Sequence, residues 1–259
     1  MRIDLHNHTI RCNHAEGSVD EYIQQAIALG IDIYGFSEHA PMEFDHNYRL
    51  RFDEMKLYEK DVLDAREKYK NEIDILLGYE IDFLPKYMDE RVLKAKVDYL
   101  IGSVHFIDEW GFDNPEFIGG YEGRDINEIW QSYFDAVESM AKSGLFDIAG
   151  HLDLLKVFKF LPTKDVRLLA KNALKAIKKA DMTIEINTAG LRKPIEEIYP
   201  SRPLIEEMYE LDIPITFGSD AHKIEHIGHG YDEAAALAKE IGYTKIMTFK
   251  NRDKQLLNF

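Results

Sequence analysis

The sequence predicts an α/β barrel, in which a closed parallel sheet is surrounded by helices. Short apolar segments rich in Ile, Leu and Val alternate about seven times with helical segments along the 259 residues. Strands buried on both faces have this composition, and the alternation builds βαβ units around a parallel sheet. At this length we expect a barrel rather than an open sheet. No repeat or linker interrupts the chain, so we expect one domain over residues 1–259.

Each predicted strand leads into a loop and then a helix. We expect strands at residues 3–5, 31–36, 73–77, 97–104, 145–149, 182–186 and 213–217, and an edge strand at 245–249. We expect helices at residues 18–29, 53–70, 86–96, 125–143, 163–180, 201–211 and 231–241. Ser18 and Glu21 have the spacing of a capping box, Thr163 is the expected N-cap of the fifth helix, and Pro203 suits a first helical turn. Residues 40–52 and 106–124 are predicted to be long loops.

The composition disfavours several classes of partner. The chain has 32 Lys and Arg against 47 Asp and Glu, a formal charge of −15, which repels nucleic acids and anionic membranes at long range. The single cysteine, Cys12, cannot form an internal disulfide and suits a reducing compartment. We see neither a signal peptide nor an apolar run of roughly 20 residues that could span a membrane. We therefore expect a soluble cytoplasmic protein.

Potential metal ligands follow directly after six of the predicted strands. His6 and His8 are two residues apart, so on an extended backbone they point to the same side. The ends of parallel barrel strands share one face, which carries the active site. The residues expected on this face are His6, His8, His39, Glu80, His105, His151, Asp220 and His222, with His14 in the first loop above them. Imidazole and carboxylate ligands suit Zn²⁺, Fe²⁺ or Mn²⁺, and this set is too large for one ion. We predict a multinuclear metal site with a bridging carboxylate.

The ordered motifs resemble those of the PHP (polymerase and histidinol phosphatase) superfamily over nearly the whole chain. They are His6-Asn-His8, Ser37-Glu-His39, Gly78-Tyr-Glu80, Gly102-Ser-Val-His105, Gly150-His-Leu-Asp153 and Gly218-Ser-Asp-Ala-His222. The resemblance implies a distorted (β/α)7 barrel, similar to a TIM barrel, with up to three divalent metals at the carboxyl ends of the strands. It implies a first metal on His6, His8, Glu80 and Asp220, a second on Glu80, His105 and His151, and a third on His14, His39 and His222.

A second stretch is similar to the stand-alone histidinol-phosphate phosphatases of that superfamily. It runs from Glu185 through Asn187 and Arg192 to Pro194 and continues in Tyr199-Pro-Ser201. The resemblance implies hydrolysis of the small phosphomonoester L-histidinol phosphate to L-histidinol and phosphate, in histidine biosynthesis. We expect a hydroxide that bridges the metals to attack phosphorus in line, with Glu80 and Asp220 in the catalytic centre.

Several polar residues are candidates for phosphate or substrate binding. Arg192 suits bidentate binding of phosphate, with a surface salt bridge to an acid at 196 or 197 as the alternative. Ser201 could bind phosphate at a helix start or act only as an N-cap. Asn187 and Lys159 are further candidates, as are His226 and His229 at the rim of the site. The proton donor to the leaving group is left open among a metal-bound water, Asp220 and a rim histidine. Cys12 receives no chemical role.

Two other functions fit the same motifs. One is a PHP phosphoesterase that acts on nucleotides, DNA 3′ ends or phosphotyrosine, although the acidic composition disfavours DNA. The other is a non-catalytic, metal-stabilised module that binds a partner. The filled ligand set and the lack of an attached domain favour catalysis. The oligomeric state and the metals bound in the cell are not predicted.

Overall fold

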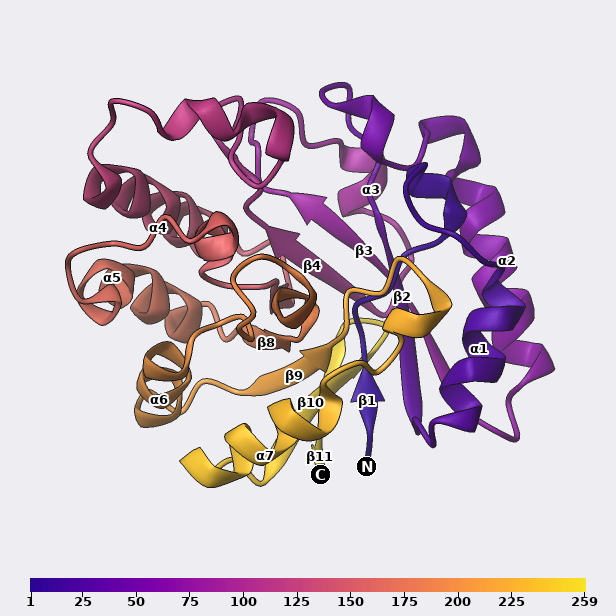
Figure 1. Ribbon diagram of the computed structural model, residues 1–259. Helices are drawn as coiled ribbons and strands as arrows, with labels where there is room; N and C mark the ends of the chain where they lie inside the picture. Colours follow the sequence, from indigo (N-terminus) through magenta and orange to yellow (C-terminus); the bar gives the residue numbers. More distant parts are fainter.

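A computed structural model describes residues 1–259. Its main sheet has seven parallel strands, which lie around a central axis (Figure 1). In spatial order they are β1 (Ile3–Asp4), β2 (Ile33–His39), β3 (Asp74–Asp82), β4 (Tyr99–Ser103), β7 (Ile148–Ala149), β8 (Thr183–Asn187) and β9 (Ile215–Gly218). The Leu5 amide donates to the Phe217 carbonyl at 2.9 Å, which joins β1 to β9. The predicted barrel is therefore confirmed.

Seven helices lie outside the sheet (Figure 1). They are α1 (Val19–Ala28), α2 (Met55–Lys68), α3 (Glu90–Leu93), α4 (Ile126–Ser143), α5 (Val166–Lys179), α6 (Arg202–Glu210) and α7 (Tyr231–Ile241). The capping box of Ser18 and Glu21 is present. Helix α3 is much shorter than predicted. The predicted N-cap of α5 is wrong, because the Thr163 hydroxyl accepts a hydrogen bond from Asn127 and Asp165 caps the helix instead.

The two predicted loops contain short regular elements. Residues 106–124 include a small hairpin of β5 (Phe106–Ile107) and β6 (Trp110–Gly111), followed by a 3₁₀ helix at Pro115–Tyr121. Residues 40–52 include a 3₁₀ turn at His46–Tyr48. Both segments lie beyond the carboxyl ends of the strands, so they border the predicted site face.

The C-terminal strand does not extend the barrel sheet as an edge, which corrects our expectation for residues 245–249. β10 (Lys245–Lys250) pairs only with β11 (Asp253–Asn258), in an antiparallel hairpin. The Phe249 ring lies 6.1 Å from the Tyr99 ring, and the Arg252 amide donates to the Asp98 carbonyl just before β4. The hairpin therefore covers the amino-terminal end of the barrel, opposite the predicted site.

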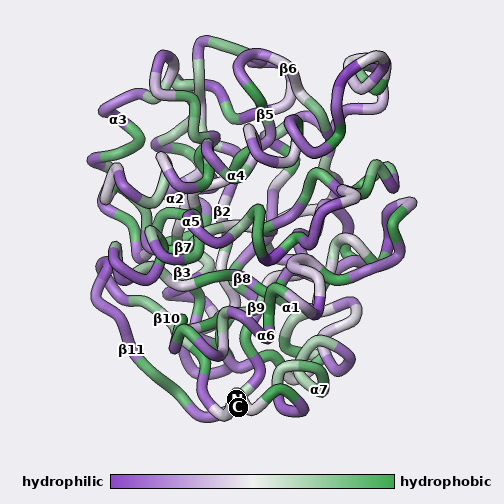
Figure 2. Tube along the Cα trace, turned by 90° about the vertical axis from the view of Figure 1, so that its left-hand side faces the viewer, coloured by the Kyte–Doolittle hydropathy of each residue, from purple (hydrophilic) through white to green (hydrophobic).

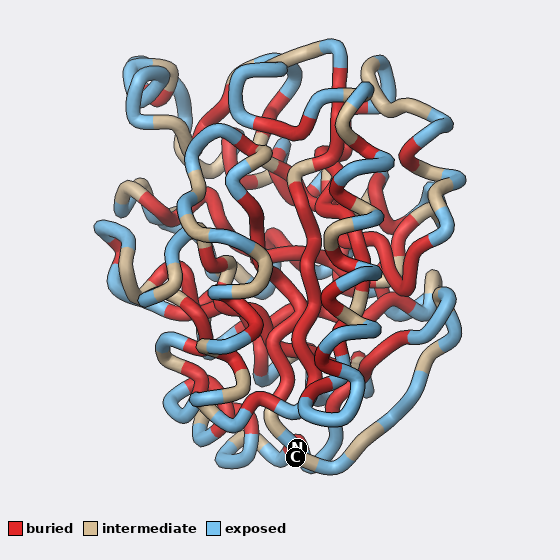
Figure 3. Tube along the Cα trace, turned by 90° about the vertical axis from the view of Figure 1, so that its right-hand side faces the viewer, coloured by how far each residue is buried: buried red, intermediate tan, exposed pale blue.

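The barrel interior is filled by side chains, and Tyr99 shows how closely. Its hydroxyl crosses from β4 to donate to the Leu5 carbonyl at 2.6 Å. A Cβ at Gly35 on β2 or at Gly78 on β3 would collide with the Tyr99 ring or hydroxyl, so glycine is needed at both positions. Figure 3 shows the strands as a buried layer inside an exposed periphery. Figure 2 shows apolar and polar residues alternating along the outer helices, as amphipathic helices require. No helix combines the length and apolarity that a membrane crossing would need.

Candidate metal centre

The histidine and carboxylate side chains predicted to bind metal gather at the carboxyl ends of the barrel strands. They come from β2 and β3, from the turns after β1, β4, β7 and β9, and from the first loop. Six of the nine line one cavity of about 350 Å³: His14, His39, His105, His151, Asp220 and His222. The other three, His6, His8 and Glu80, are buried beside them.

Glu80 is the common point of the cluster, because its two carboxylate oxygens face different groups of imidazoles. Oε1 lies 2.8 Å from His151 Nε2 and 3.6 Å from His105 Nε2. Oε2 lies 3.4 Å from His6 Nε2 and 3.7 Å from His8 Nε2. This is the arrangement that a bridging carboxylate requires.

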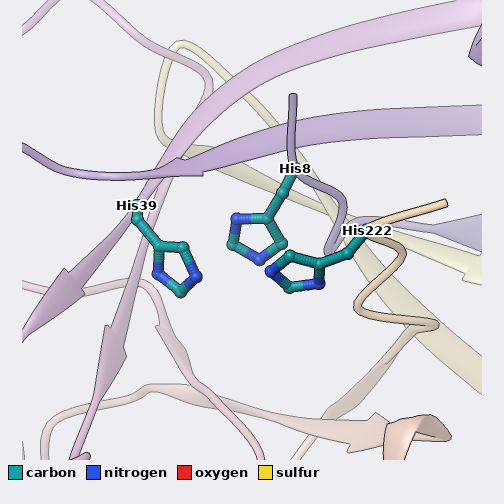
Figure 4. A group of neighbouring side chains, drawn as sticks. All are labelled: His8, His39 and His222. Atoms are coloured by element: carbon teal, nitrogen blue, oxygen red, sulfur yellow. The ribbon is translucent and has the colours of Figure 1, made fainter. Parts of the chain in front are cut away.

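A further group of imidazoles surrounds His8. Figure 4 shows the His8 ring between those of His39 and His222, with ring centroids 4.0 Å and 4.2 Å away. The His14 ring lies 4.6 Å from that of His222 and 5.2 Å from that of His39. The structure thus brings together the three histidines of the implied third site, and it also places His8 next to them.

Asp220 reaches the cluster from the turn after β9. Its Oδ1 lies 3.2 Å from His8 Nε2, 4.0 Å from His6 Nε2 and 3.4 Å from His222 Nδ1. Its φ of 52° is in the left-handed region, which is uncommon for a residue with a side chain. The Asp220 amide donates to the His6 carbonyl at 2.7 Å and holds this turn against β1.

Three imidazoles are held by buried carboxylates that the sequence analysis did not identify. The pairs are Glu185 Oε1 with His6 Nδ1 at 2.8 Å, Glu38 Oε1 with His8 Nδ1 at 3.4 Å, and Asp82 Oδ1 with His105 Nδ1 at 2.6 Å. A carboxylate that accepts the Nδ1 proton leaves the lone pair on Nε2, which points into the cluster. Metal-binding histidines commonly have such partners.

The unpaired atoms of the cluster fit divalent metal ions. His6 Nε2, His8 Nε2, His222 Nε2 and Glu80 Oε2 are buried and have no hydrogen-bond partner. Buried polar atoms without partners are costly, and all of these carry lone pairs that a cation can accept. The donor atoms also form close groups, including His6 with His8 and Glu80, and Glu80 with His105 and His151.

Metal binding requires neutral imidazole and ionised carboxylate, and the carboxylates of the cluster meet this requirement. Although burial opposes it, the same carboxylates raise the pKa of His8 to about 9 and of His105 to about 10, so a metal ion has to displace a proton from each of these imidazoles. Burial, together with the charge of His8, lowers the pKa of His39 to about 3. Burial alone would raise the pKa of Glu80, but the surrounding imidazoles outweigh it and hold the pKa well below its usual value. The pKa of Asp220 is well below its usual value for the same reason.

Arg192 lies in the wall of the same cavity, at the end of a 3₁₀ helix (Ala189–Arg192). Its Nη2 donates to the carbonyls of Ser219 at 2.7 Å and Asp220 at 3.2 Å. Its Nη1 is buried without a partner. The alternative salt bridge is not formed, since Glu197 pairs with Lys156 instead. The guanidinium is therefore free to bind an anion in the cavity.

Four other predicted phosphate or substrate residues do not line this cavity. The Asn187 side chain donates to Glu185 and accepts from the backbone, so it supports the cluster from behind. Ser201 lines a separate cavity of about 510 Å³. Lys159 and His229 are exposed, and of the two rim histidines only His226 lines the cavity.

A second chamber of about 260 Å³ adjoins the first and shares His14, His39, His105 and Asp113 with it. Its other walls come from the segments around residues 45–49 and 106–117, which contribute the aromatic side chains Tyr48, Phe106 and Phe117. Asp113 was not identified from the sequence, because an acidic residue in a long loop gives no signal of where it points.

The fold and the ligand cluster define a metal-dependent enzyme of the barrel class, and comparison with known proteins identifies its family. The sequence matches the PHP domain over residues 4–189 and a PHP-associated region over residues 206–246. The chain belongs to the PHP family.

Several relatives that match over nearly their full length are named histidinol-phosphatases, and others are named only as phosphatases. A Deinococcus radiodurans protein assigned this activity is 37% identical, and the match covers 97% of this chain and 98% of that protein. The histidinol-phosphatase of Bacillus subtilis is 28% identical over 88% of this chain and 96% of its own length.

Solved structures of the same kind share the fold. The structure assigned as histidinol phosphatase HisK of Listeria monocytogenes is 26% identical with a TM-score of 0.80, covering 90% of this chain and 99% of that one. The Lactococcus lactis histidinol phosphate phosphatase has a TM-score of 0.79 at 22% identity, covering 98% of both chains. That structure is a complex with zinc, L-histidinol and phosphate.

Proposed function

We propose that this protein is a histidinol-phosphatase, a phosphoric monoester hydrolase that converts L-histidinol phosphate to L-histidinol and phosphate. One observation carries the proposal. The Glu80 carboxylate lies between two groups of imidazoles, and Arg192, whose Nη1 has no hydrogen-bond partner, lines the adjoining cavity. The full-length relatives from Deinococcus radiodurans and Bacillus subtilis support it, because they carry this activity in their names.

The three ligand groups suggest three divalent ions in each chain. We propose that His6, His8, Glu80 and Asp220 hold the first, that Glu80, His105 and His151 hold the second, and that His14, His39 and His222 hold the third. Zinc, iron and manganese all accept these ligands. When bound, such ions polarise a phosphoryl oxygen and make hydroxide available near neutral pH.

The protein's own groups supply orientation and charge. Arg192 binds phosphate oxygens through Nη1 and orients the ester for in-line attack. Glu38, Asp82 and Glu185 hold the Nδ1 protons of three imidazoles, so that each Nε2 stays available as a ligand. Fixed groups of this kind need no rearrangement when charge develops on the phosphoryl oxygens.

The second chamber suits the organic part of L-histidinol phosphate. Tyr48, Phe106 and Phe117 offer aromatic surface for an imidazole ring. Asp113 has no salt-bridge partner, so its carboxylate can pair with an ammonium group. The two adjoining chambers, of about 350 and 260 Å³, suit a small phosphomonoester. The acidic residues in the chamber disfavour a DNA end or another nucleotide chain.

The test is release of phosphate by the metal-loaded protein from histidinol phosphate, p-nitrophenyl phosphate, dAMP and a phosphotyrosine peptide. We expect the highest kcat/KM with histidinol phosphate. A matched control is His46→Ala, since His46 is exposed and outside the cluster. A higher value with dAMP or the peptide would indicate another phosphoesterase, and release from none would indicate a binding module.

The proposal also includes a single catalytic unit over residues 1–259 and a cytoplasmic location, because its substrate is an intermediate of amino-acid synthesis. Detection of the activity in the soluble fraction of the source cells is the check. Activity confined to a membrane or secreted fraction would contradict the location.

A further inference from the structure

Asp4 and Ser219 form a buried pair next to the metal centre, and the proposed mechanism uses neither residue. We infer that this pair positions Arg192 for phosphate binding, by fixing the backbone carbonyls to which the guanidinium is bound. The inference rests on the proposed function, because it concerns the phosphate contact of the same site.

The Asp4 carboxylate accepts two hydrogen bonds from Ser219. Oδ1 accepts the Ser219 amide proton at 2.9 Å, and Oδ2 accepts the Ser219 hydroxyl proton at 2.6 Å. Asp4 is 1% exposed, so water does not compete for these bonds. The carboxylate is itself held by the Asn7 amide group at 3.1 Å and the Gly228 amide at 3.2 Å. A residue bound at both its amide and its side chain has little freedom to rotate its carbonyl.

That carbonyl is the main support of Arg192. The Ser219 oxygen accepts from Arg192 Nη2 at 2.7 Å, and the Asp220 oxygen adds a longer bond at 3.2 Å. No carboxylate pairs with Arg192, so its guanidinium is held by neutral groups and keeps its full positive charge for a ligand. Its free Nη1 is buried in the same region. The direction of the guanidinium is therefore set by the orientation of two carbonyls, and Asp4 sets the first of them.

Asp4 and Ser219 also lie where the barrel closes, since Asp4 ends β1 and Ser219 follows β9. Backbone hydrogen bonds on both sides of this pair also join β1 to β9 and close the barrel. The Leu5 amide donates to Phe217 at 2.9 Å, and the His8 amide donates to Ala221 at 3.0 Å. Loss of the Ser219 hydroxyl alone leaves these bonds in place, so a purely structural role and a positioning role can be separated.

The experiment is a double-mutant cycle of Ser219→Ala and Arg192→Ala. The readouts are the dissociation constant for inorganic phosphate, measured by calorimetry on the metal-loaded protein, together with KM, kcat and metal content. We expect Ser219→Ala to weaken phosphate binding and raise KM about 3- to 10-fold, the usual effect of one hydrogen bond. We expect kcat to change less than about twofold and the metal content to stay the same, because the loss concerns binding of the ester. In the Arg192→Ala background, Ser219→Ala should have no further effect.

The matched control is Ser103→Ala, which removes another buried serine hydroxyl, one without a hydrogen-bond partner. We expect it to leave phosphate binding unchanged. Asp4→Asn should weaken phosphate binding at least as much as Ser219→Ala, because its amide would face groups that all donate. If Asp4→Asn fails to fold, the double-mutant cycle of Ser219→Ala and Arg192→Ala still tests the inference.

Three outcomes overturn the inference, and they show whether the proposed phosphate contact fails with it. Normal phosphate binding by Ser219→Ala, or an equal further loss in the Arg192→Ala background, removes the positioning role and leaves the proposed function intact. Normal phosphate binding by Arg192→Ala removes the phosphate contact itself, and with it both the positioning role and that part of the proposed function.

Discussion

Replacing Glu185 with Gln is expected to weaken zinc binding about 10- to 100-fold while the fold survives, as loss of a carboxylate behind a metal-binding histidine does. Glu185 is buried on β8, with 1% of its surface exposed. Its Oε1 accepts the His6 Nδ1 proton at 2.8 Å, and its Oε2 accepts from the His151 amide at 2.8 Å and from Asn187 at 3.1 Å. Both oxygens therefore face donors.

A Gln side chain at position 185 cannot accept hydrogen bonds from both sets of donors. If its oxygen faces His6, its NH₂ group faces the two donors on the other side. If its NH₂ group faces His6, the imidazole must accept at Nδ1 and carry its proton on Nε2, which removes the lone pair a metal needs. A hydrogen bond to a charged group contributes about 1.5–3 kcal/mol, and about 1.4 kcal/mol corresponds to a factor of ten. These values agree with the expected loss.

The assay is zinc titration of the chelator-stripped protein against a chromophoric chelator, with circular dichroism to confirm the fold. The control is Glu59→Gln, because the Glu59 carboxylate accepts from the Tyr79 hydroxyl and contacts no imidazole. Wild-type zinc affinity in Glu185→Gln would refute the argument that this carboxylate sets the His6 tautomer.

Three further predictions concern the core and the site. Gly78→Ala places a Cβ 2.6 Å from the Tyr99 ring, and urea unfolding should show a loss of about 1–3 kcal/mol, as overpacking does. Burial raises the pKa values of Tyr34, Tyr58 and Tyr99 well above 10. These tyrosines stay protonated in the folded state and ionise near pH 10 when unfolded, so stability is complete below about pH 10 and falls as the pH rises, by up to about 1.4 kcal/mol per pH unit for each. Urea unfolding between pH 9 and 11, with absorbance at 295 nm, checks this. His8→Ala should abolish phosphate release while circular dichroism stays native.

Each of these has its own control and contrary result. Gly119→Ala is the control for the core, because its Cβ would meet nothing within 4 Å; equal losses for both variants would argue against overpacking. Unchanged stability from pH 9 to 11 would mean that the tyrosines ionise in the folded protein. Near-normal turnover by His8→Ala with analysed metal content would exclude His8 from the centre.

Much of the fold and the cluster was predictable because the signals are local. The apolar segments mark the strands, and a parallel barrel places every strand end on one face, so His6, Glu80, His105 and His151 had to meet there. The second chamber was less predictable. Asp113 comes from a segment without periodicity, and its direction depends on the packing of the β5–β6 hairpin.

The supporting carboxylates show where sequence reasoning stops. Asp82 lies two residues after Glu80 on β3, so strand periodicity could have placed the two on the same side. Glu185 meets His6 across 179 residues of sequence, and only the register of the barrel brings them together. The same holds for Arg192, whose support comes from the turn after β9.

The sequence alone determined the barrel, its seven strands and the face on which nine potential ligands gather, because these follow from residue type and from the spacing of strands and helices. Only the tertiary structure decided which carboxylate holds which imidazole. It also directed Arg192 into the cavity, left Ser201, Lys159 and His229 outside it, and turned the C-terminal strand into a separate hairpin. The physical reason is the sequence distance over which each signal acts. Periodicity shows which side of its own helix or strand a residue occupies, whereas its contact partner depends on the packing of elements that are far apart in the chain.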